Sequence, residues 1–310
     1  DTRHPLMRGG LPFEPGPIRQ ALGDTDCVLL IGGPFFEPVW FEAGLPFPDG
    51  CKVFQIEQAP AMLARNYTLT GGAVGAALPA LEALKAAVAP HAETAAQRTA
   101  ALGAAKAEAA EAQASRVKRA EGRRPMAMSV AMAAMAEALP ENAVLVEEAI
   151  TASLDFARSF DLSGPGDYYS GRGGAIGQGL AGAIGVATAK PDAKVVCISG
   201  DGSAMYSIQS LWTAAHHNLN VVFVILSNRE YRILKHNIDV YRGRFDADSN
   251  RGYTHMDLTG PDLGFVQMAA GMGVRAEQVT EPEALKAALA RACAADGPAL
   301  IDVVIEGKAR

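Results

Sequence analysis

Two uninterrupted apolar runs limit the folds that this chain can adopt. They are KVVCIS at 194–199 and NVVFVIL at 220–226, and neither alternates apolar with polar side chains. Strands of this kind are buried on both faces, as in parallel sheets covered by helices on either side. The segment between them predicts a helix with one apolar face, formed by Ile208, Leu211, Trp212 and Ala215. The runs therefore indicate an α/β fold built on a parallel sheet.

Helix and strand signals alternate from Pro125 onward. A helical spacing of apolar residues at 128–139 is followed by the strand-like run AVLVEE at 143–148. Further on, a helix is predicted at 282–294, and the run ALIDVVI at 299–305 is expected to close the sheet. The alternation predicts a doubly wound parallel sheet, in which ligands bind at the carboxyl ends of the strands.

The helix at 282–294 carries start signals of its own. Pro282 falls in the first turn, where the missing N–H of a proline costs nothing. Thr280 and Glu283 have the spacing of a capping box. We therefore expect Thr280 to cap this helix.

Composition divides the chain into three regions. Residues 1–90 contain two strand-like runs, at 27–33 and 52–58, followed by the apolar helical pattern LPALEALKAAV. Residues 91–124 are rich in alanine and charged residues, so they favour helix but offer little apolar surface for docking, which is typical of a linker. Residues 125–310 hold the doubly wound sheet.

Charge and cysteine usage exclude several classes of protein. A net charge of -6 and a pI near 5.6 argue against a nucleic-acid binder. No apolar run approaches the roughly 18 residues that indicate a membrane span. The four cysteines form no CxxC pair, which favours a reducing, cytoplasmic setting. The first residues show neither an initiator methionine nor a signal peptide, so we expect the sequence to begin partway through a longer protein.

Polar residues directly follow the two apolar runs. Asp201 follows the first and Asn228 the second, so both are expected at the same edge of the sheet. Carboxylate and amide oxygens suit Mg²⁺, which commonly completes its shell with phosphate oxygens. Gly200 and Gly202 would let the backbone approach a diphosphate. A simple tight turn at GDG is the alternative interpretation.

Residues 200–228 resemble the thiamin diphosphate motif, which is GDG, about 25 further residues and Asn. The resemblance extends to the benzoylformate decarboxylase and acetolactate synthase branch of thiamin diphosphate enzymes. It is carried by GDGSAMYSIQSLWTAA, GGAIGQGLAGAIGVATA, SNREYRILKHN and RHPLMRG followed by VLLIGGPFF. Residues 1–90 then resemble the later part of a Rossmann-like middle domain, and 125–310 resemble the domain that binds diphosphate and Mg²⁺.

The resemblance implies three protein ligands for Mg²⁺. They are the side chains of Asp201 and Asn228 and the backbone carbonyl of Glu230. It also implies that Gly202 and Ser203 contact the diphosphate.

Further cofactor contacts follow from the same resemblance. Ile150 and Thr151 fall near the diphosphate side, and Tyr231 lies against the site. Ile176 matches the bulky residue that holds thiamin diphosphate in a bent shape, and the carbonyl of Gly174 accepts a hydrogen bond from its pyrimidine amino group.

The implied activity is a thiamin diphosphate- and Mg²⁺-dependent decarboxylase or carboligase that acts on a small 2-oxo acid. Family members take their activating glutamate from an N-terminal pyrimidine-binding domain of a neighbouring subunit, and benzoylformate decarboxylase carries its catalytic histidines and serine on that domain. No catalytic acid or base is therefore assigned within this sequence, and a homodimer or homotetramer is expected. The alternatives are an acetolactate synthase-like carboligase and a noncatalytic cofactor-binding subunit.

The sequence departs from benzoylformate decarboxylase around the substrate. Val39 or Trp40 stands where that enzyme has a histidine, while Ile233 and Asn237 replace a smaller residue and an aromatic one. These differences argue against benzoylformate itself as the substrate.

Other polar features have competing interpretations. Gly177, Gly179 and Gly182 spell GxGxxG, but a loop-like segment precedes them where a dinucleotide fingerprint requires a strand. Glu147 and Glu148 end a strand at the functional edge, either in contact with a ligand or in solvent. The histidine pair 216–217 is expected at the surface, and His236 either faces the site or lies on a helix face.

Overall fold

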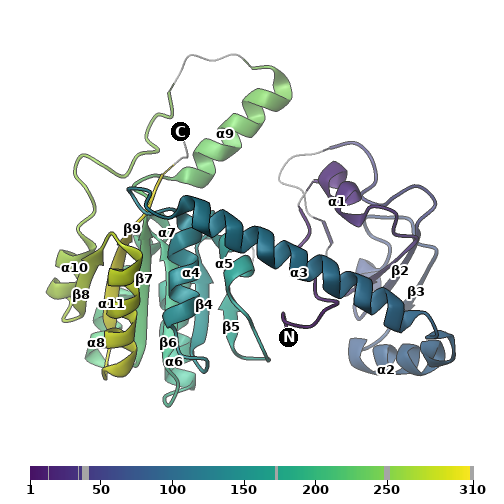
Figure 1. Ribbon diagram of the computed structural model, residues 1–310, viewed down its shortest axis with the longest axis horizontal. Helices are drawn as coiled ribbons and strands as arrows, with labels where there is room; N and C mark the ends of the chain where they lie inside the picture. The colour runs from purple at the N-terminus through teal and green to yellow at the C-terminus, as the bar shows by residue number, and fades with distance from the viewer. Residues whose placement is uncertain (13, 34, 37–41, 172–173, 248–251, 308–310) are drawn as a thin grey trace. The chain divides into compact units, whose positions relative to one another are not determined.

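The computed structural model describes residues 1–12, 14–33, 35–36, 42–171, 174–247 and 252–307. The chain divides into two compact units. The small unit is Pro5–Ala105, and the large unit is Asp1–His4 together with Lys106–Arg310. The small unit holds a three-stranded sheet and the large unit a six-stranded sheet (Figure 1).

The sheet of the large unit is parallel throughout, in the order β5-β4-β6-β7-β9-β8. Its strands are β4 (Val144–Glu148), β5 (Tyr168–Ser170), β6 (Val195–Gly200), β7 (Val221–Ser227), β8 (Arg275–Val279) and β9 (Ala299–Val304). The two apolar runs of the sequence form β6 and β7, and every residue of β7 is buried. The predicted α/β fold with a parallel sheet is therefore confirmed.

Helices cover both faces of this sheet (Figure 1). One face packs against α4 (Met128–Ala138), α5 (Ser153–Ser159) and α11 (Pro282–Ala294). The other face packs against α6 (Gln178–Ala189), α8 (Ser210–His216) and α10 (Phe265–Gly271). Two more helices, α7 (Asp201–Ala204) and α9 (Arg232–Phe245), follow β6 and β7.

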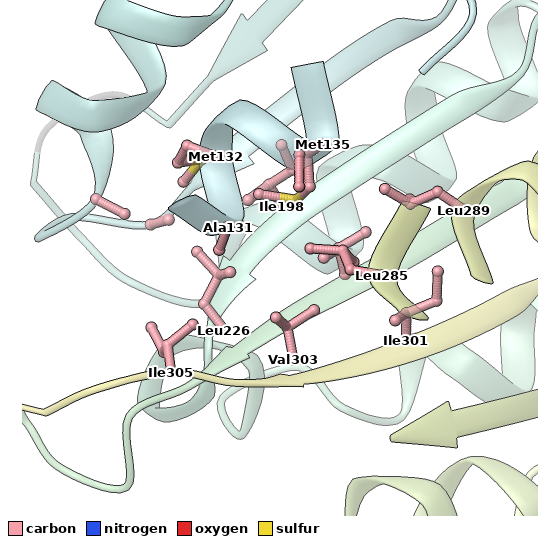
Figure 2. Packing of buried hydrophobic residues seen from close by; sticks show 14 of the residues in the cluster. Ala131, Met132, Met135, Ile198, Leu226, Leu285, Leu289, Ile301, Val303 and Ile305 are labelled. Atoms are coloured by element: carbon pink, nitrogen blue, oxygen red, sulfur yellow. The ribbon is translucent and has the colours of Figure 1, made fainter. Parts of the chain in front are cut away.

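Alternate residues of each central strand supply the two cores. Ile198 of β6 packs with the α4 and α11 side, whereas its neighbour Cys197 packs with the α6 and α8 side. Figure 2 shows Met132 and Met135 of α4 beside Leu285 of α11 over the strands. Burying one such side chain stabilises the fold by about 1.5–3 kcal/mol.

The small unit is built on β1 (Cys27–Ile31), β2 (Lys52–Glu57) and β3 (Gly71–Val74), which pair in parallel in that order. Its helical segments are α1 (Pro15–Leu22), η1 (Pro60–Met62), α2 (Ala77–Val88) and η2 (Ala89–His91). The core contains Leu30 and Val53 together with Phe47, whose ring meets Tyr67 edge-on at 5.2 Å. The strands predicted at 27–33 and 52–58 are thus present.

The segment predicted as a linker forms one continuous helix, α3 (Ala95–Ala120). Alanine has the highest helix propensity of any residue, which explains a helix with little apolar surface. Its last turns do dock, because Val117 and Ala120 pack into the core of the large unit. Lys106 also donates a hydrogen bond to the carbonyl of His4 at 2.9 Å.

Three details of the large unit differ from the sequence predictions. The strand at the C-terminus does not close the sheet, because β8 pairs outside β9 and forms the edge. Of the predicted apolar face of α8, Leu211 is buried, but Trp212 is 55% exposed and Ala214 faces the core instead of it. The predicted capping box is absent, because Glu281 is the N-cap of α11 and makes no side-chain capping bond.

Candidate functional site

The loops after β4, β6 and β7 lie together at the carboxyl edge of the large sheet. The chain leaves β4 toward α5 on one face and leaves β6 toward α7 and α8 on the other. Adjacent strands whose connections diverge in this way open a crevice at their carboxyl ends, where α/β sheets bind ligands. The predicted site residues lie in the loops after β4 and β7, in the short helix α7 that directly follows β6, or in the turn before α6.

Asp201 joins the loop after β6 to the loop after β7. Its Oδ2 accepts a hydrogen bond from the backbone N–H of Arg229 at 2.6 Å, and its Oδ1 accepts one from the N–H of Gly202 at 2.8 Å. Arg229 has a φ of 60°, a left-handed conformation that is uncommon for a non-glycine residue. Such a conformation persists only where surrounding contacts fix it, and the bond to Asp201 is one of them.

The carboxylate of Asp201 is buried, with 3% of the residue exposed. Burial raises the pKa of this carboxyl to about 6, against the opposing effect of the backbone donors of Arg229, Gly202 and Asn228. Within the described residues no cationic side chain pairs with it. A buried carboxylate is costly without a compensating positive charge, so a cation would stabilise this site.

Asn228 and Glu230 lie in the loop after β7. The Oδ1 of Asn228 accepts a hydrogen bond from the N–H of Glu230 at 3.0 Å. The carboxylate of Glu230 pairs with the buried Lys235, which also contacts Asp257 at 2.5 Å. Lys235 thus holds Oε2 of Glu230, while the buried Oε1 has no hydrogen-bond partner among the described residues. The predicted metal ligand is the backbone carbonyl of Glu230, not this side chain.

Gly202 allows a close approach that no larger residue could make. A Cβ at this position would lie 2.6 Å from Cε1 of Tyr231, so the aromatic ring rests directly on the glycine. Ser203, which follows, is buried, and its hydroxyl makes no hydrogen bond within the described part of the chain. The Ser203 hydroxyl is not fully enclosed by the protein, so a polar ligand can reach it.

These residues fit a magnesium ion. Asp201 and Asn228 offer a carboxylate and an amide oxygen, the hard donors that Mg²⁺ prefers, and the carbonyl of Glu230 would be a third oxygen. Among the described residues, no three or more His, Cys, Asp or Glu side chains are grouped to hold a metal. The predicted set differs from such groups because it contains a single acidic side chain.

The loop after β4 carries Ile150 and Thr151. Ile150 is 45% exposed although it is apolar, and Thr151 is half-buried. Both therefore present side-chain surface at the carboxyl edge, next to the strand β6 that leads to Asp201.

The turn before α6 carries Gly174 and Ile176. Gly174 is exposed with a φ of 70°, and Ile176 is half-buried. Gly177 caps α6 in the left-handed conformation, with a φ of 94°, and a Cβ there would lie 2.7 Å from the Cβ of Tyr206. Glycine is therefore required at 177 for the turn to reach the loop after β6.

Glu148 is a structural residue that the sequence left undecided. It is buried at the end of β4 and accepts hydrogen bonds from the N–H groups of Gln178 at 2.8 Å and Gly179 at 3.0 Å. The solvated interpretation is wrong for this residue. Its negative charge lies at the start of α6, where the helix dipole favours an anion, and it anchors the turn that carries Ile176.

Glu147 is also buried and fully engaged. It accepts hydrogen bonds from the N–H of Ala149 at 2.7 Å, the hydroxyl of Ser153 at 2.9 Å and the hydroxyl of Tyr168 at 3.1 Å. The sequence could indicate both glutamates as polar residues in an apolar strand. Only the positions of α5 and α6 decide what they bind.

The remaining candidates contribute less to the site. His216 is exposed and stacks on Trp212 with ring centroids 4.8 Å apart, and His236 is exposed on α9. Gly177 follows a loop rather than a strand, as the alternative to a dinucleotide fingerprint predicts. Val39 and Trp40 lie outside the described residues. Within the described ranges, no helix has the length and apolar character needed to cross a membrane.

Residues 151–303 match the family described as the C-terminal TPP-binding domain of thiamine pyrophosphate enzymes. The matched range begins at Thr151 and contains Asp201, Asn228 and Tyr231. All the loops of the candidate site after β6 and β7 therefore fall inside it.

Individual relatives extend this similarity over nearly the whole chain. Benzoylformate decarboxylase from Pseudomonas aeruginosa is 33% identical over 302 residues, which is 97% of this chain and 53% of the relative. The large subunit of acetolactate synthase isozyme 1 from Escherichia coli is 31% identical over 179 residues, 56% of this chain and 30% of the relative. The solved structure of a thiamine diphosphate-dependent 4-hydroxybenzoylformate decarboxylase from Rhodococcus jostii RHA1 superposes with a TM-score of 0.80 at 27% identity, covering 99% of this chain and 54% of that one. The chain spans about half the length of the decarboxylases that it matches.

Proposed function

We propose, on the premise that this chain carries the C-terminal domain of a thiamine pyrophosphate enzyme, that it forms the cofactor-binding half of a Mg²⁺-dependent decarboxylase or carboligase acting on a 2-oxo acid. One observation carries the proposal. The buried carboxylate of Asp201 is bound to the backbone of Arg229, which gathers the oxygen donors of two loops at the crevice of the sheet. A diphosphate bound through a metal ion fits that arrangement.

The residues of the chain would share the work of binding. Asp201, Asn228 and the carbonyl of Glu230 would hold Mg²⁺, which would supply positive charge for the diphosphate. Gly202 and Ser203 would contact the diphosphate, and the Ser203 hydroxyl makes no hydrogen bond to the described residues. Ile150 and Thr151 approach it from the loop after β4, where both side chains reach the surface.

A second group of residues would orient the cofactor. When bound, thiamine pyrophosphate supplies a nucleophilic carbon for the substrate carbonyl and a ring that accepts the electron pair left by CO₂. Ile176 would hold the two rings in a bent relationship, and the carbonyl of Gly174 would accept a hydrogen bond from the pyrimidine amino group. Tyr231 closes one wall, because its ring is fixed against Gly202. Glu148 would hold the turn of Ile176 in place, because it accepts hydrogen bonds from the backbone N–H groups of Gln178 and Gly179.

Proton transfer would require groups from elsewhere. The resemblance assigns the activating glutamate and the catalytic histidines to an N-terminal domain contributed by a neighbouring subunit. We therefore propose that the active enzyme is at least a homodimer that includes such a domain.

Product analysis tests the reaction. The intact protein, with saturating cofactor and Mg²⁺, is incubated with pyruvate, benzoylformate and a branched 2-oxo acid, and both CO₂ and the organic product are measured. An aldehyde product supports a decarboxylase. A 2-hydroxy-2-methyl-3-oxo acid from pyruvate supports the carboligase alternative, which the similarity to acetolactate synthase favours. Absence of CO₂ with every 2-oxo acid, despite tight cofactor binding, would contradict both and indicate a noncatalytic subunit.

The 310-residue chain provides a second comparison. Because the resemblance assigns the activating glutamate to a pyrimidine-binding domain, residues 1–310 alone are expected to release CO₂ far more slowly than a protein that includes that domain. Equal rates would show that this chain carries its own activating acid.

A further inference from the structure

A polar cavity of ≈ 170 Å³ lies within the large unit, beside the carboxyl ends of β4, β7 and β9. Four arginines line it: Arg116, Arg119, Arg123 and Arg232. They come from the last turns of α3, the turn that follows α3, and the first position of α9. Sequence positions more than a hundred residues apart therefore contribute positive charge to one cavity.

Carboxylates balance only part of this charge. Asp155 pairs with Arg116 at 2.6 Å, and Glu306 pairs with Arg123 at 3.4 Å. These are the two carboxylates that line the cavity. Arg119 and Arg232 make no hydrogen bond or ion pair within the described part of the chain. Two guanidinium groups are thus left without an anion.

The positions of these two arginines in their helices differ in an informative way. Arg119 lies in the last turn of α3, where the negative end of the helix dipole favours a cation. Arg232 is the first residue of α9, at the positive end of that helix, where a cation is disfavoured. Arg232 therefore adds positive charge to a helix end that is already positive, and no carboxylate among the described residues pairs with it.

The start of a second helix adds to the positive potential. Met128 and Ser129, the first two residues of α4, line the same cavity, and no side chain caps that helix end. Unpaired N–H groups at a helix start bind anions, especially phosphate. Thr151, which is proposed above to contact the cofactor diphosphate, also lines this cavity, so the two sites would share a border at this residue.

We propose that this cavity is a binding site for a phosphoryl group, separate from the site of the cofactor diphosphate. The two negative charges of a phosphoryl dianion match the two unpaired guanidinium charges. Its oxygens can also accept two parallel hydrogen bonds from a single guanidinium group. The cavity also has room for several non-hydrogen atoms, which is more than a single ion requires. The ligand is inorganic phosphate or a small phosphate monoester, and it lies next to the candidate active site through Thr151.

Calorimetric titration of the intact protein with inorganic phosphate, at constant ionic strength, tests this site. Arg119→Gln combined with Arg232→Gln should weaken phosphate binding about tenfold or more, because two charged hydrogen-bonding groups are lost. The matched control Arg158→Gln removes an exposed arginine of α5 that does not line the cavity, and it should leave the affinity unchanged. No binding to the wild-type protein, or the same loss in the control, would overturn the proposal.

Titration in the presence of saturating thiamine pyrophosphate and Mg²⁺ separates this site from the proposed cofactor site. Phosphate should still bind, and it should still bind to Asp201→Ala. Displacement of phosphate by the cofactor would overturn the separate site while leaving the proposed function intact. A monoester such as glycerol phosphate is titrated in parallel, and tighter binding than phosphate assigns the cavity to an ester ligand.

A measurement on the wild-type protein avoids any effect of substitution on folding. Phenylglyoxal modifies accessible arginines, and its sites are read by mass spectrometry. Phosphate, but not equivalent chloride, should slow the modification of Arg119 and Arg232 and leave Arg158 unaffected. Equal modification with and without phosphate would contradict binding in this cavity.

Discussion

The carboxylate of Glu148 accepts a hydrogen bond from the backbone N–H of Gly179 at 3.0 Å, and the two residues are so close that a Cβ on the glycine would lie 2.8 Å from the Cβ of the glutamate. The contact joins the end of β4 to the start of α6. Because the second oxygen accepts from Gln178 at 2.8 Å, the turn that carries Ile176 has one fixed position relative to the crevice.

This contact predicts a stability effect for Glu148→Gln. The amide keeps one acceptor oxygen but presents N–H donors to the other backbone N–H, so the free energy of unfolding should fall by about 1–3 kcal/mol. Urea denaturation measures the change. Glu137→Gln is the matched control, since Glu137 forms an exposed pair with Lys286 at 2.7 Å and its loss should change the stability little. A loss in Glu148→Gln no larger than in the control would mean that the buried contact is not stabilising.

The contact between Gly202 and Tyr231 predicts a difference between two neighbouring glycines. Gly202→Ala places a methyl group 2.6 Å from the Tyr231 ring and should destabilise the protein by about 1–3 kcal/mol through overpacking. Gly200→Ala is the control, because nothing lies within 4 Å of a Cβ at that position. Combining Gly202→Ala with Tyr231→Ala should recover part of the loss. Equal effects of the two glycine substitutions on thermal unfolding would contradict the packing described.

The role proposed for Ile176 separates turnover from cofactor binding. Ile176→Ala should lower kcat roughly ten- to a hundredfold, because the reacting groups lose their alignment while the diphosphate anchor persists. The cofactor Kd should change much less than kcat. Steady-state kinetics and a cofactor titration are measured on the same preparation, and an unchanged kcat would identify Ile176 as an ordinary packing residue.

The sequence predicts the central strands well and the edges of the sheet poorly. The continuous apolar runs form β6 and β7, because helices cover both faces of the sheet and nearly every residue of these strands is buried. An uninterrupted apolar run is therefore enough to identify them. The edge strand β8, RAEQV, is polar and half-exposed, so no apolar pattern distinguishes it from a loop. The apolar spacing places Trp212 on the buried face because it begins at Ile208, which lies before the start of α8.

The residues of the candidate site can also be predicted from the sequence only in part. Asp201 and Asn228 are predictable because each directly follows a recognisable strand, and strand ends in a parallel sheet meet at one edge. The arginine cavity is not predictable, because it depends on where α3 and α9 lie after folding. The basic segment RVKRAEGRR is visible in the sequence, but nothing in it indicates that Arg232 faces the same space.

The central claim is that Asp201 anchors the cofactor through a divalent metal ion. The most direct measurement is a fluorescence titration of the intact wild-type protein and of Asp201→Asn with thiamine pyrophosphate, each with Mg²⁺ and with excess EDTA. Asparagine preserves size and one acceptor oxygen but removes the negative charge. The wild-type protein should bind the cofactor at least about a hundredfold more tightly with Mg²⁺ than with EDTA, and Asp201→Asn should lose most of that difference, since several charge-assisted contacts depend on the metal. An Asp201→Asn variant that binds as tightly as wild type, with the same dependence on Mg²⁺, would contradict the claim.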